Sequence, residues 1–241
     1  MEQQQKPSHY TALVTAKEQL SAKVYRLVCQ WQNASQMTFQ PGQFINIDVA
    51  PGVTRQYSIA SSPSHTDQIE LLVDVAPGGP GSQYFMKLEA GQTITCVGPM
   101  GKFTLVSEEG NIIFLAASTG IAPFRAMIDY VIEQQNQTND FAKRNIFLYQ
   151  SFRYEQDIFW RDYFELLETQ VPNFHFLLTL SQPNPEWNGC GGYVQACMDK
   201  QLLKNPASRF YVCGGTRMVE GVVAYLRENQ VPEDKIHFEP F

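Results

Sequence analysis

The side chains with the clearest chemical potential in the first half of the chain are an arginine and a tyrosine two residues apart. Arg55 and Tyr57 lie in the segment Arg55-Gln56-Tyr57-Ser58, which has the pattern of a strand end. Because neighbouring strand residues point to opposite faces, Arg55 and Tyr57 share one face and Ser58 lies on the other. That face offers a cation for a phosphate and an aromatic plane for a ring. Taken alone, the segment fits equally a surface arginine beside a core tyrosine.

Two glycine-containing turns each precede a predicted helix. Gly79-Pro80-Gly81-Ser82 comes before a short helix over Ser82–Leu88, with Ser82 as its expected N-cap. The segment Ser118-Thr119-Gly120 follows an apolar strand, and Pro123 suits the first turn of the next helix. Backbone N–H groups and the helix dipole converge at such starts, so both turns can bind an anion. Neither is a G-x-G-x-x-G loop, and an ordinary capped turn is the alternative for each.

Two strand ends in the last thirty residues carry further candidates. Cys213 and Gly214 end the apolar run that begins at Arg209, which places Cys213 at the carboxyl edge of a sheet. The glycine lets a ring approach there, although a buried cysteine is usually a small hydrophobic residue. Glu239 and Phe241 follow directly on the last predicted strand. A strand that leads into the terminus predicts that Phe241 is held in place.

These candidates lie in two segments with different hydrophobic periods. In the first segment, short strands alternate with Gly/Pro turns, which is typical of a small antiparallel barrel. From Asn111, apolar strands alternate with helices, which indicates a parallel sheet with helices on both faces and ligands outside the carboxyl ends of its strands. The predicted barrel strands are Tyr10–Ala16, Lys23–Gln30, Gln43–Val49, Arg55–Ser61, Gln68–Val75 and Gln92–Val97. The predicted elements of the second segment are strands Ile112–Ala117, Asn145–Gln150, Phe174–Leu180, Arg209–Cys213 and Lys235–Phe238, with helices Pro123–Gln134, Asp157–Glu168, Tyr193–Leu203 and Arg217–Glu228.

We therefore expect a two-domain protein, a six-stranded antiparallel β-barrel followed by an α/β domain with a five-stranded parallel sheet. A polar N-terminal tail covers residues 1–9, the barrel residues 10–107 and the α/β domain residues 108–241.

Composition excludes several classes of protein. The 241 residues carry a net charge of −6, which argues against a nucleic-acid partner or an anionic membrane surface. No apolar run approaches the ~20 residues that span a bilayer. The N-terminal sequence MEQQQKPSHY lacks the apolar stretch of a signal peptide, so we expect a cytoplasmic protein, with a monomer as the default state.

The cysteines and histidines predict no metal centre. The five cysteines are odd in number and lack paired spacing, so they indicate neither a disulfide framework nor an iron–sulfur site. The four histidines are dispersed and show no ligand spacing.

Taken in order, the motifs resemble the ferredoxin–NADP reductase superfamily, over residues from about Tyr10 to Phe241. They are R-x-Y-S at Arg55–Ser58, G-x-x-S at Gly79–Ser82, G-P-x-G-x-F at Gly98–Phe103, T-G-I-A-P-F-R at Thr119–Arg125, C-G-x-x-x-M at Cys213–Met218 and E-x-aromatic at Glu239–Phe241. The resemblance implies that the barrel binds a flavin and that the parallel sheet binds a nicotinamide nucleotide.

The resemblance also implies roles for single residues. Arg55 holds the flavin pyrophosphate, Tyr57 packs against the isoalloxazine, and Ser58 lies near the flavin N5 that receives hydride. Ser82 and the neighbouring N–H groups cap the phosphates. The other flavin-binding positions implied are Gln56, Val73, Gly79 and Gly81.

For the nicotinamide nucleotide, the resemblance assigns contacts to Thr119 and Gly120. Cys213 and Glu239 line the nicotinamide pocket, and Phe241 covers the second flavin face and moves aside for nicotinamide. With Ser58, these three are the implied catalytic residues. The remaining nucleotide-binding positions implied are Pro123, Ser151, Arg153, Gly214 and Met218.

The cofactors follow from the same resemblance. FAD is favoured over FMN because most of the superfamily uses FAD. Ser181-Gln182 replaces the Ser-Arg typical of NADPH enzymes and favours NADH, whereas Arg153 offers one arginine for a 2′-phosphate and keeps NADPH open. Ser118 stands where the family often has glycine.

The function implied is transfer of a hydride from NAD(P)H to FAD and then of electrons to a separate acceptor. That acceptor is a ferredoxin, a flavodoxin, an oxygenase component or a haem protein, because these residues contain no iron–sulfur motif of their own. Two alternatives stay open: a flavin reductase that releases reduced flavin, and a non-catalytic module that binds flavin or nucleotide.

Overall fold

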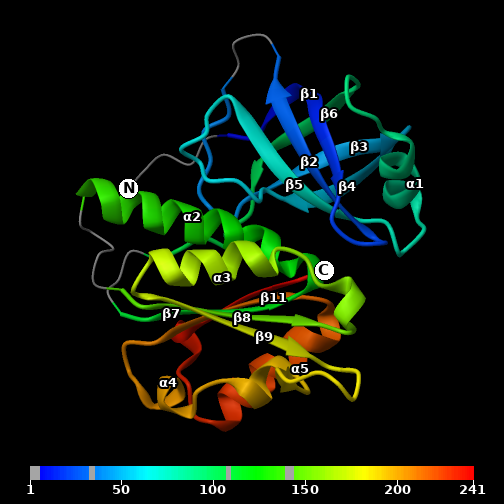
Figure 1. The fold of residues 1–241 in the computed structure, drawn as a ribbon. Helices are drawn as coiled ribbons and strands as arrows, with labels where there is room; N and C mark the ends of the chain where they lie inside the picture. The colour runs from blue at the N-terminus through cyan, green and yellow to red at the C-terminus, as the bar shows by residue number, and fades with distance from the viewer. Residues whose placement is uncertain (1–5, 33–35, 107–109, 139–143) are drawn as a thin grey trace. The chain divides into compact units, whose positions relative to one another are not determined.

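A computed structural model describes residues 6–32, 36–106, 110–138 and 144–241 of the chain. The chain divides into two compact units (Figure 1). Unit 1 comprises Met1–Leu105 with Ala122–Tyr130, and unit 2 comprises Val106–Ile121 with Val131–Phe241. The predicted boundary at residues 107 and 108 lies outside the described residues, as do residues 1–5 of the predicted tail.

Unit 1 is built on a six-stranded antiparallel sheet that curls toward closure, with the strand order β4-β3-β6-β1-β2-β5. The two outer strands meet through a bridge between Ile59 and Leu71, and the Ala60 N–H donates to the Glu70 carbonyl at 2.8 Å. The antiparallel six-stranded prediction is thus confirmed. The strands are β1 (Ser8–Gln19), β2 (Val24–Trp31), β3 (Phe44–Ala50), β4 (Val53–Ser58), β5 (Gln68–Asp74) and β6 (Thr93–Met100).

The core of unit 1 follows from the alternation along these strands. Ile45, Ile47 and Val49 of β3 are buried and alternate with more exposed neighbours. The short helix α1 (Pro80–Lys87) adds Phe85, which is 1% exposed. Burial of side chains of this size stabilises the fold by about 1.5–3 kcal/mol each. The same packing holds α1 beside β4, the strand that carries the Arg55 motif, because the centroids of the Phe85 and Tyr57 rings lie 4.9 Å apart.

Unit 2 contains a parallel sheet with the strand order β10-β9-β8-β7-β11-β12. The order reverses between β7 and β11, and such a reversal opens a crevice at the carboxyl ends of the strands. The prediction of five strands is wrong by one, because Cys190–Gly191 adds a two-residue strand too short to show a period. The strands are β7 (Ile112–Ala117), β8 (Ile146–Phe152), β9 (Phe174–Leu180), β10 (Cys190–Gly191), β11 (Arg209–Gly214) and β12 (Ile236–Pro240).

Helices lie on both faces of this sheet, as predicted. In Figure 1, α3 (Arg161–Gln170) lies on one face, and α4 (Lys200–Lys204) and α5 (Thr216–Glu228) lie on the other. The ring of Phe164 on α3 packs against the rings of Phe174 and Phe176 on β9, with distances between ring centroids of 6.2 and 5.3 Å. The remaining long helix, α2, runs from Ile121 to Thr138 and includes the predicted helix Pro123–Gln134.

Two predicted helices of unit 2 need correction. The helix predicted over Tyr193–Leu203 is instead a 3₁₀ turn at Val194–Cys197 followed by the short helix α4, because Met198 is extended and Asp199 caps α4 by accepting from the Gln201 N–H at 2.9 Å. The helix predicted from Asp157 begins only at Arg161, because Trp160 adopts a left-handed φ of 59°.

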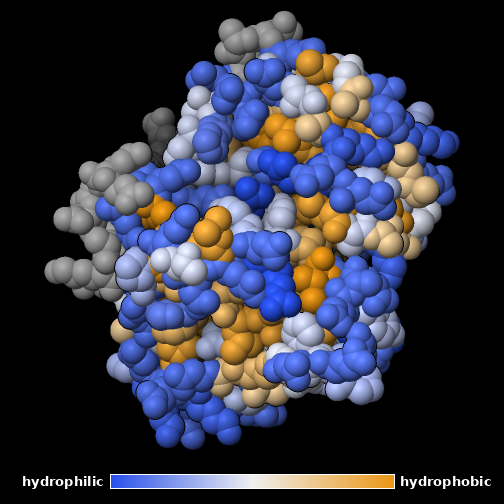
Figure 2. Space-filling model, in the orientation of Figure 1, coloured by the Kyte–Doolittle hydropathy of each residue, from blue (hydrophilic) through white to orange (hydrophobic). Residues whose placement is uncertain are grey.

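Hydrophilic residues cover much of the face shown in Figure 2, with hydrophobic patches between them. The exposed large hydrophobic side chains include Phe238 and Phe241, which are 46% and 62% exposed. Two exposed aromatic rings at the end of one strand are a feature that a binding role would explain. Among the described residues, no helix is both long and apolar enough to cross a membrane.

Candidate functional site

The Arg55 motif and the glycine turn before α1 meet in unit 1. A Cβ placed on Gly81 would lie 2.6 Å from the Tyr57 hydroxyl and 3.4 Å from Arg55 Cγ, so only glycine allows this approach. Burial raises the pKa of Tyr57 to about 12, although the Arg55 charge acts against it, and the phenol stays neutral. The two predicted motifs therefore form one surface, with a cation, a neutral aromatic ring and a close backbone.

The start of α1 differs from the prediction in its cap. Gly79 is the N-cap and Pro80 the first helical residue, so the predicted N-cap role of Ser82 is wrong. Proline is favoured at the first position of a helix, where no partner for its missing N–H is needed. Ser82 lies in the first turn and is buried, and this turn carries no acidic residue. The N–H groups at a helix start have no partner within the helix, so this turn keeps its capacity for an anion.

The three other residues of unit 1 that were predicted to bind flavin differ from one another in how far they are buried. Gln56 is exposed and Ser58 is half-buried at the end of β4, opposite Phe44 of β3. Val73 is fully buried in the core of unit 1.

In unit 2, the loop after β7 lies against the end of β11. A Cβ on Gly120 would lie 2.6 Å from the Cys213 carbonyl carbon and 2.9 Å from Gly214 Cα. The pair stands at the point where the strand order reverses, between β7 and β11. Ser118 at the start of this loop has a φ of 49°, in the left-handed region that favours glycine. A glycine at this position would adopt the same φ without the steric cost that a side chain imposes.

The end of β11 also gathers other predicted positions. A Cβ on Gly214 would lie 3.1 Å from Ala117 Cβ and 3.3 Å from Met218 Sδ, which places Met218 of α5 beside this edge. Burial raises the pKa of the Cys213 thiol, and the charge of Glu239 adds to the effect. A neutral, buried thiol therefore lines the reversal point.

The last strand brings the carboxyl terminus to the same edge. Glu239 is in register with Cys213, and the Phe241 N–H donates to the Gly214 carbonyl at 3.1 Å. Burial raises the pKa of Glu239 to about 6. The backbone of Phe241 is thus anchored while its ring stays 62% exposed.

The loops after β8 and β9 are joined by two side-chain pairs. Arg153 donates from Nε to Gln182 Oε1 at 3.2 Å, and Asn184 donates to Glu155 at 2.6 Å. Ser151, at the end of β8, is nearly buried. The predicted positions Ser151 and Arg153 therefore stand at the carboxyl edge of the sheet, with a carboxylate and an amide as neighbours that the predictions did not include.

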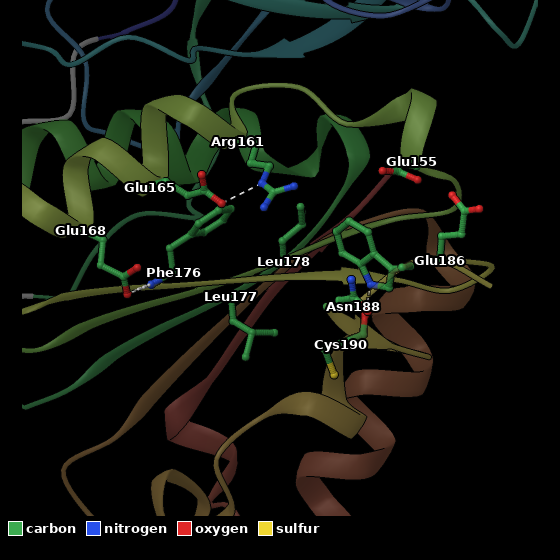
Figure 3. Close-up of a pocket in the computed structure, with 12 residues that line it drawn as sticks. Glu155, Arg161, Glu165, Glu168, Phe176, Leu177, Leu178, Glu186, Asn188 and Cys190 are labelled. Atoms are coloured by element: carbon green, nitrogen blue, oxygen red, sulfur yellow. Dashed lines mark hydrogen bonds and ion pairs between the residues drawn. The ribbon is translucent and has the colours of Figure 1, made fainter. Parts of the chain in front are cut away.

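A pocket of about 570 Å³ opens beside these loops (Figure 3). Glu155, Arg161 and Cys190 line it, together with Trp187, and Arg161 points to Glu165 in an ion pair of 2.7 Å. The sequence could not reveal this pocket, because its residues come from α3, β9, β10, the turn at Glu155 and the loop before β10, which only the fold brings together.

The structure also corrects the prediction that the cysteines form no disulfide. Cys190 and Cys197 form a disulfide, whereas Cys29, Cys96 and Cys213 are free and buried. The prediction of no disulfide framework is thus wrong for one pair.

Two family models match this chain, one over its first part and one over its second part. The model of the oxidoreductase FAD-binding domain matches residues 11–105, and that of the oxidoreductase NAD-binding domain matches residues 114–224. Ferredoxin–NADP reductase B of Sorangium cellulosum (strain So ce56) is 32% identical over 243 residues, which cover 96% of this chain and 97% of that protein. The chain belongs to the ferredoxin–NADP reductase family.

Other members of the family extend the comparison. The anthranilate 1,2-dioxygenase electron transfer component of Acinetobacter baylyi (strain ATCC 33305 / BD413 / ADP1) is 28% identical over 212 residues, which cover 87% of this chain and 60% of that protein. The crystal structure of Amycolatopsis cytochrome P450 reductase GcoB matches with a TM-score of 0.86 at 25% identity, over 98% of this chain and 70% of that one.

These findings confirm the predicted family and the predicted oxidoreductase class, with FAD and a pyridine nucleotide as cofactors. The described residues of this reductase fit both groups. Gly81 packs against Tyr57 and Arg55, which brings a cation, an aromatic ring and the N–H groups at the start of α1 onto one surface. Gly120 packs against the end of β11 at the reversal point of the parallel sheet.

Proposed function

We propose that this reductase takes a hydride from NADH, in preference to NADPH, onto bound FAD and delivers electrons to a separate acceptor protein. The observation that carries the proposal is the close approach of Gly120 to Cys213 and Gly214 at the reversal point of the parallel sheet. Nucleotides bind outside the carboxyl ends of such strands. In the proposal, residues 10–107 form the flavin domain and residues 108–241 the nucleotide domain.

Bound FAD supplies the ring that accepts hydride and the chemistry that then releases electrons singly or in pairs. The residues of unit 1 hold it. The guanidinium of Arg55 binds the pyrophosphate, and the N–H groups in the first turn of α1, at Gly81 and Ser82, bind its oxygens. The neutral ring of Tyr57 packs against the planar ring system, and its position is held by Phe85 at 4.9 Å. In the same proposal, Ser58 lies beside the atom that receives hydride, and Gln56, Val73 and Gly79 contribute to the flavin site.

The residues of unit 2 orient the nicotinamide. Thr119 and Gly120 let the nucleotide approach the backbone, and Pro123 sets the first turn of α2 behind them. Because burial keeps the Cys213 thiol protonated, this side chain contributes a neutral wall and no competing nucleophile. Orientation of the two reacting groups is the main task left to the protein in hydride transfer.

The carboxyl terminus completes this part of the proposal. Glu239, with its pKa raised to about 6 by burial, is largely ionised at neutral pH and accepts hydrogen bonds from a polar donor such as the nicotinamide amide. The exposed ring of Phe241 stacks on a planar ring and leaves when nicotinamide arrives. Gly214 and Met218 shape the same pocket.

The preference for NADH rests on the pairs at the ends of β8 and β9. A 2′-phosphate requires a cationic fork, whereas a free ribose hydroxyl suits a carboxylate. Arg153 donates to Gln182, and the nearby Glu155 carries a negative charge that repels a phosphate. Ser151, near the end of β8, is proposed to contact the nucleotide.

The acceptor is proposed from the names of relatives. The anthranilate and toluate 1,2-dioxygenase electron transfer components and the phenol 2-monooxygenase reductase component DmpP belong to oxygenase systems. We therefore propose that the acceptor is an oxygenase component, with a ferredoxin, a flavodoxin or a haem protein as alternatives.

The test is an anaerobic titration of the flavin-loaded protein, read by flavin absorbance near ~450 nm, with NADH and NADPH in parallel. Bleaching by NADH at lower concentration than by NADPH is expected. The Arg55→Ala variant is expected to lose flavin on gel filtration. Arg227→Ala, which removes an exposed arginine that pairs with Glu233, serves as the matched control. Bound flavin that neither nucleotide bleaches would refute the enzyme proposal in favour of a binding module. A colourless protein that reduces only added flavin would refute it in favour of a flavin reductase.

A further inference from the structure

The disulfide Cys190–Cys197 joins two cysteines that solvent can reach. Both are partly exposed, whereas Cys29, Cys96 and Cys213 are buried. The thiolate is the form of cysteine that exchanges with disulfides. Burial raises the pKa of Cys29 and of Cys96 to about 12 and raises that of Cys213 as well, so these three stay as thiols. Thiol–disulfide exchange is thereby confined to one pair.

This pair lies at the carboxyl edge of the parallel sheet. Cys190 is in register with Thr179 at the end of β9, and the Gly192 N–H donates to the Leu180 carbonyl at 2.8 Å. Cys197 ends the 3₁₀ turn that begins at Val194. The disulfide therefore ties the short strand β10 to the turn that follows it.

The main chain at Cys190 in turn supports Trp187. The indole Nε1 of Trp187 donates to the Cys190 carbonyl at 3.1 Å. Gly189 lies under the indole, since a Cβ there would come within 2.5 Å of a ring carbon, and the Arg161 guanidinium stands 5.8 Å from the ring. The position of the indole thus depends on the backbone that the disulfide holds.

Trp187 and Cys190 both line the pocket of Figure 3, and so does Glu155. Glu155 also accepts the hydrogen bond from Asn184, which lies in the loop between β9 and β10. The backbone N–H of Trp187 also donates to the Asn184 carbonyl at 3.1 Å. One connected set of contacts therefore runs from the disulfide through Trp187 and Asn184 to Glu155, at the edge where the nucleotide is proposed to bind.

We propose that Cys190–Cys197 is a reversible dithiol–disulfide modification site, and that its disulfide form holds the loop between β9 and β10, residues 181–189, in the conformation that binds the nicotinamide nucleotide. The second half of this statement rests on the proposed function. The exchange partner is a low-molecular-weight thiol such as glutathione. On reduction, the S–S bond breaks and its two sulfurs take up two electrons and two protons, while two glutathione thiols give up the same and join as a disulfide. Oxidised glutathione reverses the step.

The first readout is independent of any enzyme activity. The flavin-loaded protein is equilibrated with reduced or oxidised glutathione, alkylated with iodoacetamide under native conditions and mapped by mass spectrometry. Alkylation at Cys190 and Cys197 is expected in the sample equilibrated with reduced glutathione, and it is expected to be absent when a reduced sample is returned to oxidised glutathione before iodoacetamide is added. Tryptophan fluorescence is expected to change in step, and the change is expected to vanish in Trp187→Phe and in the double variant Cys190→Ser/Cys197→Ser. Equal alkylation in both buffers would overturn the modification site.

The second readout is the KM for NADH of the same two samples. Reduction is expected to raise KM by about fivefold or more while kcat changes less, the range of an ordinary coupling between two sites. The double serine variant is expected to keep the high KM in both buffers, and the wild-type protein itself provides the test if that variant fails to fold. A reversible change in alkylation with an unchanged KM would overturn the control of the loop. If neither nucleotide bleaches the flavin, the proposed function fails, together with the part that rests on it, while the alkylation result still decides the modification site.

Discussion

Gly120→Ala is the change for which the structure yields the most definite expectation. The new Cβ would stand 2.6 Å from the Cys213 carbonyl carbon, about 0.8 Å short of the 3.4 Å at which ordinary contact begins. Gly120 is not among the residues with a positive φ, so alanine is strained there by its contacts with Cys213 and Gly214 and not by its backbone conformation. The end of β11 is paired on both sides, with β7 and with β12, and we expect the loop rather than the strand to move.

The expected displacement of the loop predicts how far the rate of flavin reduction by NADH falls. Displacement of a bound reactant by about 1 Å costs roughly a hundredfold in rate, which corresponds to ~2.7 kcal/mol of transition-state stabilisation. We therefore expect Gly120→Ala to reduce its flavin with NADH roughly a hundredfold more slowly than the wild type. Flavin retention is expected to be unchanged, because the proposed flavin residues lie in the other unit.

Anaerobic stopped-flow absorbance measures this rate directly, and the flavin spectrum of the purified variant checks its loading. Gly221→Ala is the matched control, since a Cβ there meets nothing within 4 Å and alanine is favoured in a helix by about 1 kcal/mol. A wild-type rate and a wild-type KM in Gly120→Ala would refute the reasoning that the nucleotide approaches the chain at this glycine.

Glu70 of unit 1 and the residues at the ends of β11 and β12 provide three further tests. Although burial opposes it, the hydrogen bond from Arg26 and the charge of Arg125 hold the pKa of Glu70 below its usual range. Its stabilising effect is therefore fully present above the unfolded pKa near 4.5 and is lost as pH falls through the lower folded pKa. Glu70→Gln is expected to lower the free energy of unfolding near neutral pH by about 1.5–3 kcal/mol in urea titrations and to flatten its acid dependence, and equal curves for the two proteins would contradict this. Phe241→Ser is expected to lower the KM for nicotinamide nucleotide by removing an exposed ring that competes for the same stacking position, and unchanged affinity would count against that role. Cys213→Ala is expected to slow flavin reduction while flavin stays bound; a wild-type rate would make this cysteine structural.

Local sequence patterns correctly predicted most of the strands and helices. Strands Ile112–Ala117 and Phe174–Leu180 have the predicted bounds. Ile112–Ala117 is almost entirely buried and therefore apolar throughout, and Phe174–Leu180 is a largely apolar run. The helices over Tyr193–Leu203 and from Asp157 were predicted wrongly for a shared reason. Their apolar spacing suits a helix, but the left-handed Trp160 and the extended Met198 interrupt it, and both conformations depend on the surrounding packing rather than on the local sequence.

The candidate site divides in the same way. The Arg55 face, the glycine before α1 and the glycine after β7 follow from residue types and spacing, because the alternation of a strand and the small size of glycine are local properties. The meeting of Gly81 with Tyr57 and of Gly120 with Cys213 joins segments far apart in the chain, and only the packed structure establishes it.

The residues alone therefore determined the two kinds of sheet, the family and the chemistry that the family implies, since these depend on periodicity and on short motifs. Tertiary structure alone decided that Cys190 reaches Cys197 and that Trp187, Glu155 and Arg161 share a pocket. Each of these depends on distances between segments, which are set when the whole chain buries its apolar side chains and which no local pattern encodes.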